Sequence, residues 1–156
     1  MKHITNLFFI ISFFFFLFAC TDRNPYRLYL ERAEKLLDEY PDSAFKYLDI
    51  IISPELLNEK DFHTYVLLQV QSKYSSRRDI SKDTVIFSLR GCYEDSNLEK
   101  AAIIYLYSGV IYELQESYQD ALNHYLKAEK LAVNLEPSLK AKIQYFIGSL
   151  FSQRII

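Results

Sequence analysis

The sequence has few residues of the kinds that break helices or build chemical centres. Its 156 residues include three glycines, four prolines, two cysteines, three histidines and no tryptophan. A small scaffold held by disulfides needs several cysteine pairs, so that class of protein is excluded. A metal site needs three or four converging ligands, and these few histidines and cysteines do not recur at such spacings. The sequence therefore predicts neither a metal nor a cofactor.

The sequence also has no long block of like charge. It carries 18 lysines and arginines against 20 aspartates and glutamates, a formal net charge of −2. Nucleic-acid-binding domains usually carry a basic patch, so we expect no nucleic-acid partner. The glycine-rich phosphate loop, the Gly-x-Ser-x-Gly elbow and the His-Glu-x-x-His motif are all missing. We therefore predict that the protein is not an enzyme, and an enzyme with an unrecognised site is the alternative.

The first twenty residues have the order of a secretory signal. A short basic start, Lys2 and His3, precedes an apolar run from Leu7 to Phe18. A membrane-spanning helix needs about 20 apolar residues, and this run is shorter. A charged start, a short apolar stretch and a small residue are typical of a cleaved signal. The alternatives are an uncleaved helix and a helix buried in a core.

The end of this run, Leu17-Phe18-Ala19-Cys20, resembles a bacterial lipobox. The resemblance implies that Cys20 carries a lipid and becomes the mature N-terminus. Residues 1–19 would then be the signal peptide and residues 20–25 a tether. The protein would be anchored in the cell envelope, in the inner or the outer membrane, facing the periplasm or the cell surface.

The rest of the chain carries apolar residues at three- and four-residue spacings, which is typical of amphipathic helices. Sustained two-residue alternation is missing, so no strands are predicted. Asp42 or Ser43 is expected to cap the second helix, and Cys92 is expected to pack inside the fourth. We predict helices at about 28–37, 42–52, 60–74, 83–93, 98–115, 118–135 and 138–153.

One region carries a repeat motif on two successive helices. The motif consists of Tyr105-x-x-Ser108-Gly109-x-x-Tyr112 followed by Ala121-x-x-x-Tyr125-x-x-Ala128. It resembles the tetratricopeptide repeat, a pair of helices that stacks on its neighbours. The resemblance places Gly109 and Ala121 where the two helices approach closely. It places Tyr112, Tyr125 and Ala128 in the space between this pair and the next helix. A generic helical hairpin with a chance match is the alternative.

A second match to the first half of the motif lies near the C-terminus. It reads Gln144-x-x-Ile147-Gly148-x-x-Phe151, with Gly148 39 residues after Gly109, against a usual period of about 34. The resemblance divides the chain into degenerate helical hairpins at 26–97, one repeat at 98–135 and the first helix of an incomplete repeat at 138–156. The predicted fold is all-α, a tetratricopeptide-like right-handed α-solenoid of about seven helices. With its leader, the chain resembles exported tetratricopeptide repeat lipoproteins of Bacteroidetes.

The resemblance also implies a concave face that binds partners. The residues expected there are Ile103, Leu106, Val110 and Glu113. This apolar set with one acid suggests an apolar peptide or helix as partner. Burial against the molecule's own first helices or against missing repeats is the alternative. The leading hypothesis is a membrane-anchored, non-catalytic interaction module with an unknown protein or peptide partner. The rival is the sensor part of a larger signalling or transcription regulator. Self-association through the C-terminal helix is a further expectation.

Overall fold

The computed structural model describes residues 25–152, and this part of the protein is all-helical, without strands. The predicted signal peptide, Cys20 and residues 153–156 lie outside the described residues. Two short 3₁₀ helices, η1 and η2, interrupt the series of α-helices. The elements in chain order are α2 (Arg27–Leu36), α3 (Pro41–Asp49), η1 (Pro54–Leu56), α4 (Glu59–Ser75), η2 (Thr84–Leu89), α5 (Leu98–Leu114), α6 (Tyr118–Leu131) and α7 (Pro137–Ser152).

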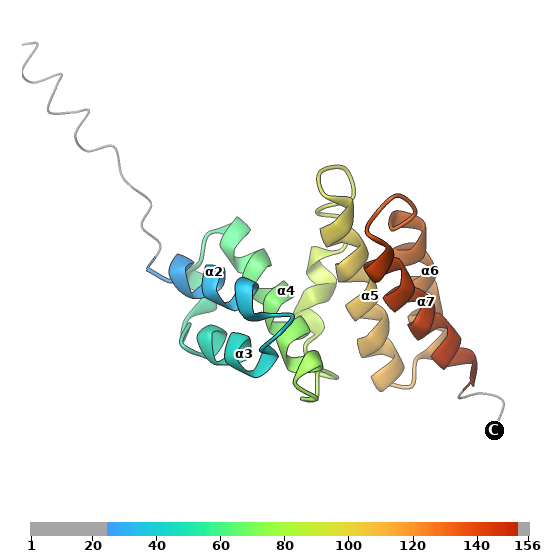
Figure 1. Ribbon diagram of the computed structural model, residues 1–156, viewed down its shortest axis with the longest axis horizontal. Coiled ribbons are helices and arrows are strands. Elements are labelled where there is room, and N and C mark those ends of the chain that lie inside the picture. Colours follow the sequence, from blue (N-terminus) through green and yellow to red (C-terminus); the bar gives the residue numbers. More distant parts are fainter. Residues whose placement is uncertain (1–24, 153–156) are drawn as a thin grey trace, which may run out of the picture.

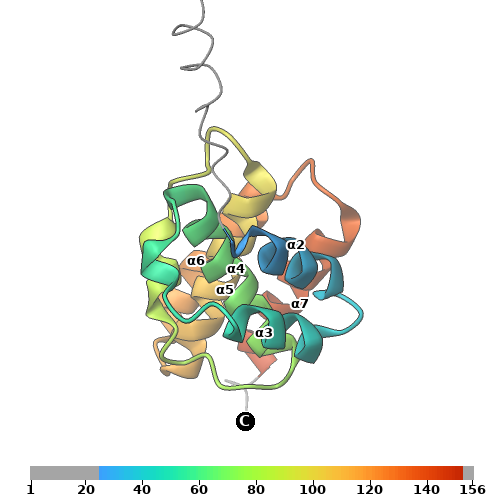
Figure 2. The same ribbon diagram turned by 90° about the vertical axis from the view of Figure 1, so that its left-hand side faces the viewer.

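The helices follow one another along the long axis of the molecule in the order of the chain (Figure 1). Each α-helix packs mainly on its neighbours in sequence: α2 on α3, α3 on α4, α5 on α6, and α6 on α7. Seen from the end of the molecule, the helices lie one behind another (Figure 2). None of the helices in residues 25–152 combines the length and the apolar character that a membrane crossing needs.

Asparagine and proline mark several helix starts. Asn58 accepts a hydrogen bond from the Asp61 backbone N–H at 2.9 Å, and Asn97 accepts one from Lys100 N–H at the same distance. These bonds satisfy backbone donors that have no partner within the first turn. The prediction of a cap at Asp42 or Ser43 was wrong. Helix α3 begins at Pro41, which tolerates the first helical position because it has no N–H to satisfy.

The predicted helix at 83–93 was also wrong, because the chain forms the shorter 3₁₀ helix η2 there, followed by a turn. Ile86 and Leu89 are fully buried at a spacing of three residues, which is the period of a 3₁₀ helix. Gly91 has a φ of +87° and so ends any helical continuation. Cys92, expected inside a packed helix, is exposed in the turn that follows.

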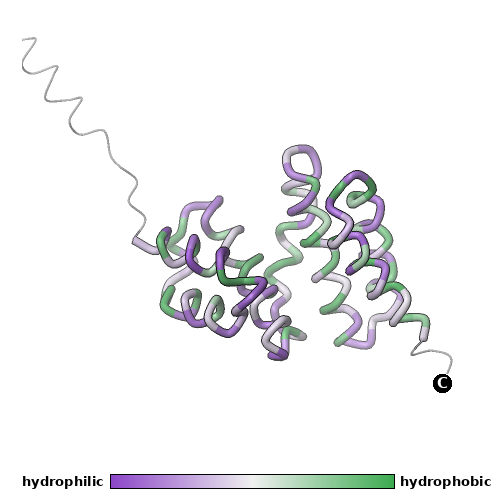
Figure 3. The backbone as a smooth tube through the Cα atoms, in the orientation of Figure 1, coloured by the Kyte–Doolittle hydropathy of each residue, from purple (hydrophilic) through white to green (hydrophobic). Residues whose placement is uncertain are grey.

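Helix α5 occupies the centre of the C-terminal half and is buried on several sides. It contacts α4, η2, α6 and α7. The hydropathy pattern follows this position, since α5 is among the most apolar segments of the backbone trace (Figure 3). Its buried residues are Ala101, Ala102, Ile104, Leu106, Tyr107, Ser108, Gly109, Val110 and Ile111.

Candidate functional site

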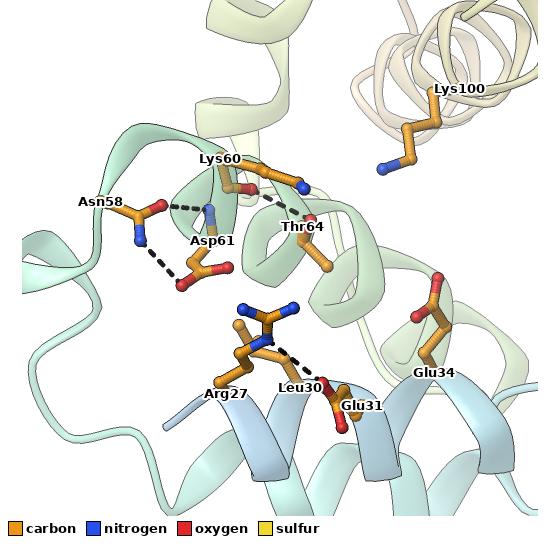
Figure 4. A pocket seen from close by; sticks show the side chains of 9 residues that line it. All are labelled: Arg27, Leu30, Glu31, Glu34, Asn58, Lys60, Asp61, Thr64 and Lys100. Atoms are coloured by element: carbon orange, nitrogen blue, oxygen red, sulfur yellow. Dashed lines mark hydrogen bonds and ion pairs between the residues drawn. The ribbon is translucent and has the colours of Figure 1, made fainter. Parts of the chain in front are cut away.

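A groove runs between α2 and α5, with α4 as its floor. It consists of two adjoining pockets of about 340 and 330 Å³ that share Glu34, Thr64 and Lys100 (Figure 4). We call this feature the inner groove. It is lined by Arg27, Leu30, Glu31, Glu34, Leu37 and Asp38 of α2, by Asn58 before α4, by Lys60, Asp61, Thr64, Leu67, Leu68 and Gln71 of α4, by Asn97 before α5, and by Glu99, Lys100 and Ile103 of α5.

Carboxylates outnumber cations along the inner groove. Two of these carboxylates already have partners within the protein. Glu31 pairs with Arg27 at 3.2 Å, and Asp61 accepts a hydrogen bond of 2.9 Å from the Asn58 amide. Glu34 and Lys100 point into the space between the walls from opposite sides (Figure 4). The carboxylates are Glu31, Glu34, Asp38, Asp61 and Glu99, against Arg27, Lys60 and Lys100. The groove therefore has an acidic excess, which favours a partner with basic groups.

Part of the floor of the inner groove is apolar, beside the polar Thr64 and Gln71. Leu30, Leu67 and Leu68 are buried, and Ile103 is half-buried at the wall formed by α5. An apolar floor with polar and charged walls is the usual composition of a protein-binding surface, whose core is apolar and whose rim is polar. The groove can hold a segment that presents apolar and basic side chains together.

The predicted partner residues divide between the groove and the core. Ile103 lines the inner groove. Leu106 and Val110 are 0% and 3% exposed, and neither lines the inner groove. They lie in the part of α5 that is buried where this helix contacts α4, η2, α6 and α7. The groove is therefore more charged than the expected apolar surface.

Glu113, the acid predicted for the partner surface, acts inside the repeat. Its carboxylate accepts a hydrogen bond of 2.6 Å from the hydroxyl of Tyr125. Burial of Tyr125, followed by this bond to Glu113, raises the pKa of the phenol well above its ordinary value. This hydrogen bond joins α5 to α6 and occupies part of the hydrogen-bonding capacity of the Glu113 carboxylate.

The close helix approach predicted at Gly109 is present. A Cβ atom at this position would lie 2.5 Å from the Tyr125 ring and 3.2 Å from the Ala121 carbonyl oxygen. Ala121, Tyr125 and Ala128 are fully buried. Tyr125 extends to the next helix, where its ring centroid lies 5.6 Å from that of Phe146 in α7. This is the packing that the motif implies for the pair α5 and α6.

The other aromatic positions of the motif contact both α6 and the chain before α5, and the ring centroid of His124 in α6 lies 5.8 Å from that of Tyr105 and 4.9 Å from that of Tyr112. Tyr112 stacks on Phe87 of η2 with ring centroids 4.7 Å apart, so it does not fill the space toward the next helix as expected. Tyr105 donates a 2.7 Å hydrogen bond to Glu94, which also pairs with Lys127 at 2.6 Å. Burial and the Glu94 carboxylate raise the pKa of Tyr105 to about 12.

A contact between Arg90 and His124, which no local pattern in the sequence indicates, joins the end of η2 to α6. Arg90 Nη1 lies 2.7 Å from His124 Nε2, and His124 Nδ1 lies 2.8 Å from the Asp120 carbonyl oxygen. Since a carbonyl only accepts, Nδ1 carries the proton and Nε2 accepts from Arg90. Burial and then the Arg90 charge hold the pKa of His124 below its ordinary value. The two residues are 34 positions apart, beyond the reach of a local spacing rule.

Within residues 25–152, no group of three or more histidine, cysteine, aspartate or glutamate side chains is placed to hold a metal ion. Comparison with protein-family models, with curated proteins and with solved structures finds no match.

Proposed function

We propose that this protein is a lipid-anchored, non-catalytic interaction module that holds a segment of a partner protein in the inner groove. The observation that carries the proposal is the groove itself. Side chains of α2, α4 and α5 together form its apolar base and its charged walls. Tetratricopeptide-like stacking into a right-handed solenoid accounts for it, because such arrays turn the first helix of each pair toward a common concave side. The close approach at Gly109 and the pairing of α5 with α6 support this reading.

The partner segment carries basic side chains beside apolar ones. Lysine or arginine would be attracted to the acidic excess around Glu34, Asp38 and Glu99. Apolar side chains would lie over Leu67 and Leu68 on the floor of the groove. An extended peptide or one face of a helix can meet both requirements.

The lipobox-like run ending at Cys20 supports an anchor in the cell envelope, facing the periplasm or the cell surface. One acyl chain holds a protein at a membrane only weakly, whereas two or more give stable anchoring. Removal of the leader with lipid attached to Cys20 would place the helical domain about six residues from the bilayer, on the 20–25 tether.

The anchor is tested by mass spectrometry of the mature N-terminus. We expect a chain that begins at an acylated Cys20, released into the aqueous phase when Cys20→Ser replaces the lipidated residue. An intact leader, or an unmodified cysteine at the N-terminus, would contradict the anchor and leave the groove proposal standing.

The groove is tested by reversing one charge in it. We expect Glu34→Lys to reduce recovery of the partner crosslinked in native membranes by roughly five- to tenfold, because the acidic attraction becomes repulsion. The matched control is Glu136→Lys, since Glu136 is an exposed glutamate outside the groove. Equal losses for the two variants would show that the protein's overall charge matters and that the groove does not.

A further inference from the structure

An uncharged stripe runs along the outer side of α7. Its residues recur at spacings of three and four, so they share one face of the helix. The opposite side of α7, with Ile143, Phe146 and Leu150, is buried against the rest of the molecule. All members of the stripe are exposed, Tyr145 at 70% and Phe151 at 52%. We call it the α7 stripe, and it consists of Ala141, Gln144, Tyr145, Gly148, Phe151 and Ser152.

Gly148 lies at the centre of the α7 stripe with open space above it. A Cβ atom on Gly148 would meet nothing within 4 Å, whereas one on Gly109 would meet Tyr125 and Ala121. The two glycines occupy the same place in the matching motifs of α5 and α7. The surface at Gly148 is thus shaped for the close approach of another helix, and residues 25–152 do not supply one.

The α7 stripe has the same character on both sides of Gly148. Gln144 and Tyr145 lie four and three residues before the glycine, and Phe151 and Ser152 lie three and four residues after it. If two copies cross antiparallel at Gly148, Gln144 and Tyr145 of one copy reach the level of Phe151 and Ser152 of the other. Each end of the contact then joins two aromatic rings and two hydrogen-bonding groups. Such self-complementarity is what a two-fold symmetric contact requires.

The charges of α7 favour the same orientation. The helix has no acidic side chain, and its cations, Lys140 and Lys142, lie in its first half. Lys142 donates to the Tyr107 hydroxyl at 2.8 Å and so faces α5, whereas an antiparallel partner places Lys140 near the C-terminal end of the neighbouring helix. The last carbonyl groups of a helix carry partial negative charge and attract cations. A parallel pair would instead bring Lys140 of the two copies together.

We propose that two copies of this chain associate through the α7 stripe, with their helices antiparallel and crossing at Gly148. The contact is separate from the inner groove and needs neither the partner segment nor the lipid anchor. A helix of another protein could cover the stripe, but it would not be required to match its symmetry.

The test is disulfide crosslinking of the full chain in native membranes, with Cys92→Ser in every variant. We expect oxidation of Gly148→Cys to give a covalent dimer, because this position meets its own copy at the crossing. Co-expressed Tyr145→Cys and Ser152→Cys should also crosslink to each other. Tyr145→Cys alone should not, since its two copies lie about 9 Å apart along the pair, beyond the reach of a disulfide. Ile52→Cys, at an 86% exposed position, measures random collision.

A second variant separates loss of association from loss of folding. Gly148→Glu has room for its side chain and puts two like charges on the symmetry axis. We expect the Tyr145→Cys and Ser152→Cys crosslink to fall at least about tenfold in this background, with the helical circular dichroism unchanged. Crosslinks that resist Gly148→Glu would overturn the proposal. A Gly148→Cys variant that stays monomeric after oxidation would also overturn the proposal. This holds whether maleimide labels the cysteine freely or another segment protects it.

Discussion

At the scale of single residues, two glycines in matching motifs have opposite surroundings. The space that a side chain at Gly109 would need is occupied by the Tyr125 ring, while the space at Gly148 is empty. A methyl group forced into a packed crossing moves the helices or the ring apart. A methyl group on an exposed helix restricts the unfolded chain and favours the helix. The same substitution should therefore have opposite signs at the two sites.

We predict that Gly109→Ala lowers the free energy of unfolding by about 1–3 kcal/mol and that Gly148→Ala raises it by about 0.5–1 kcal/mol. Gly109→Leu should cost more than Gly109→Ala. The measurement is urea unfolding of the chain without residues 1–19, at a concentration low enough that association does not contribute. Equal effects at the two glycines would mean that α5 and α6 do not approach as described.

The sequence predicted the close approach at Gly109 because the motif relates that glycine to Ala121 and Tyr125 through local spacing. It did not predict which side of α5 would be open. Leu106 and Val110 are apolar, and apolar side chains are equally suited to a binding surface and to a core. The packing of α4, η2, α6 and α7 on α5 decides between these, and that packing joins residues far apart in the chain.

At the scale of elements, long helices were predictable and the segment between α4 and α5 was not. The apolar periodicity of 60–74 and 98–115 agrees with α4 and α5 to within one or two residues. The segment at 83–93 has a similar apolar content, but its buried residues, Ile86 and Leu89, are spaced for a 3₁₀ helix. One contact of this segment, Arg90 with His124, spans 34 residues and left no local pattern.

This contact should make the stability of the protein depend on pH. Folding holds the pKa of His124 below its ordinary value of 6.5, so the unfolded chain binds more protons as the pH falls through that value. Stability is therefore complete above pH 6.5 and decreases below it, where protonated His124 would face the Arg90 cation. We expect the melting temperature to fall between pH 7.5 and 5.5.

The control for this prediction is the other described histidine. We expect His124→Gln to flatten the change in melting temperature, because glutamine can accept from Arg90 without titrating. His63→Gln should keep it. His63 Nδ1 instead lies 3.2 Å from the Tyr93 hydroxyl. A slope that follows His63 would assign the pH dependence to the contact between α4 and the turn after η2.

At the scale of the whole molecule, the chain order of the helices along one axis produces both candidate surfaces. Helices α2, α4 and α5 line the inner groove, and α7 packs on α6 at the far end of the molecule. The sequence predicted an apolar partner surface with one acid, whereas the inner groove has charged walls. Charged residues such as Glu34, Asp61 and Lys100 come from three helices, and their common position follows only from the tertiary arrangement.

The central claim is that a partner lies in the inner groove, and photo-crosslinking from single positions tests it most directly. A photoreactive amino acid replaces Thr64, on the floor of the groove, or Leu126, which is 46% exposed on α6 and outside the groove. Irradiation of cells that carry the full chain should give a discrete protein adduct from position 64 and none from position 126. An adduct from position 126 alone, or the same adduct from both positions, would contradict the account.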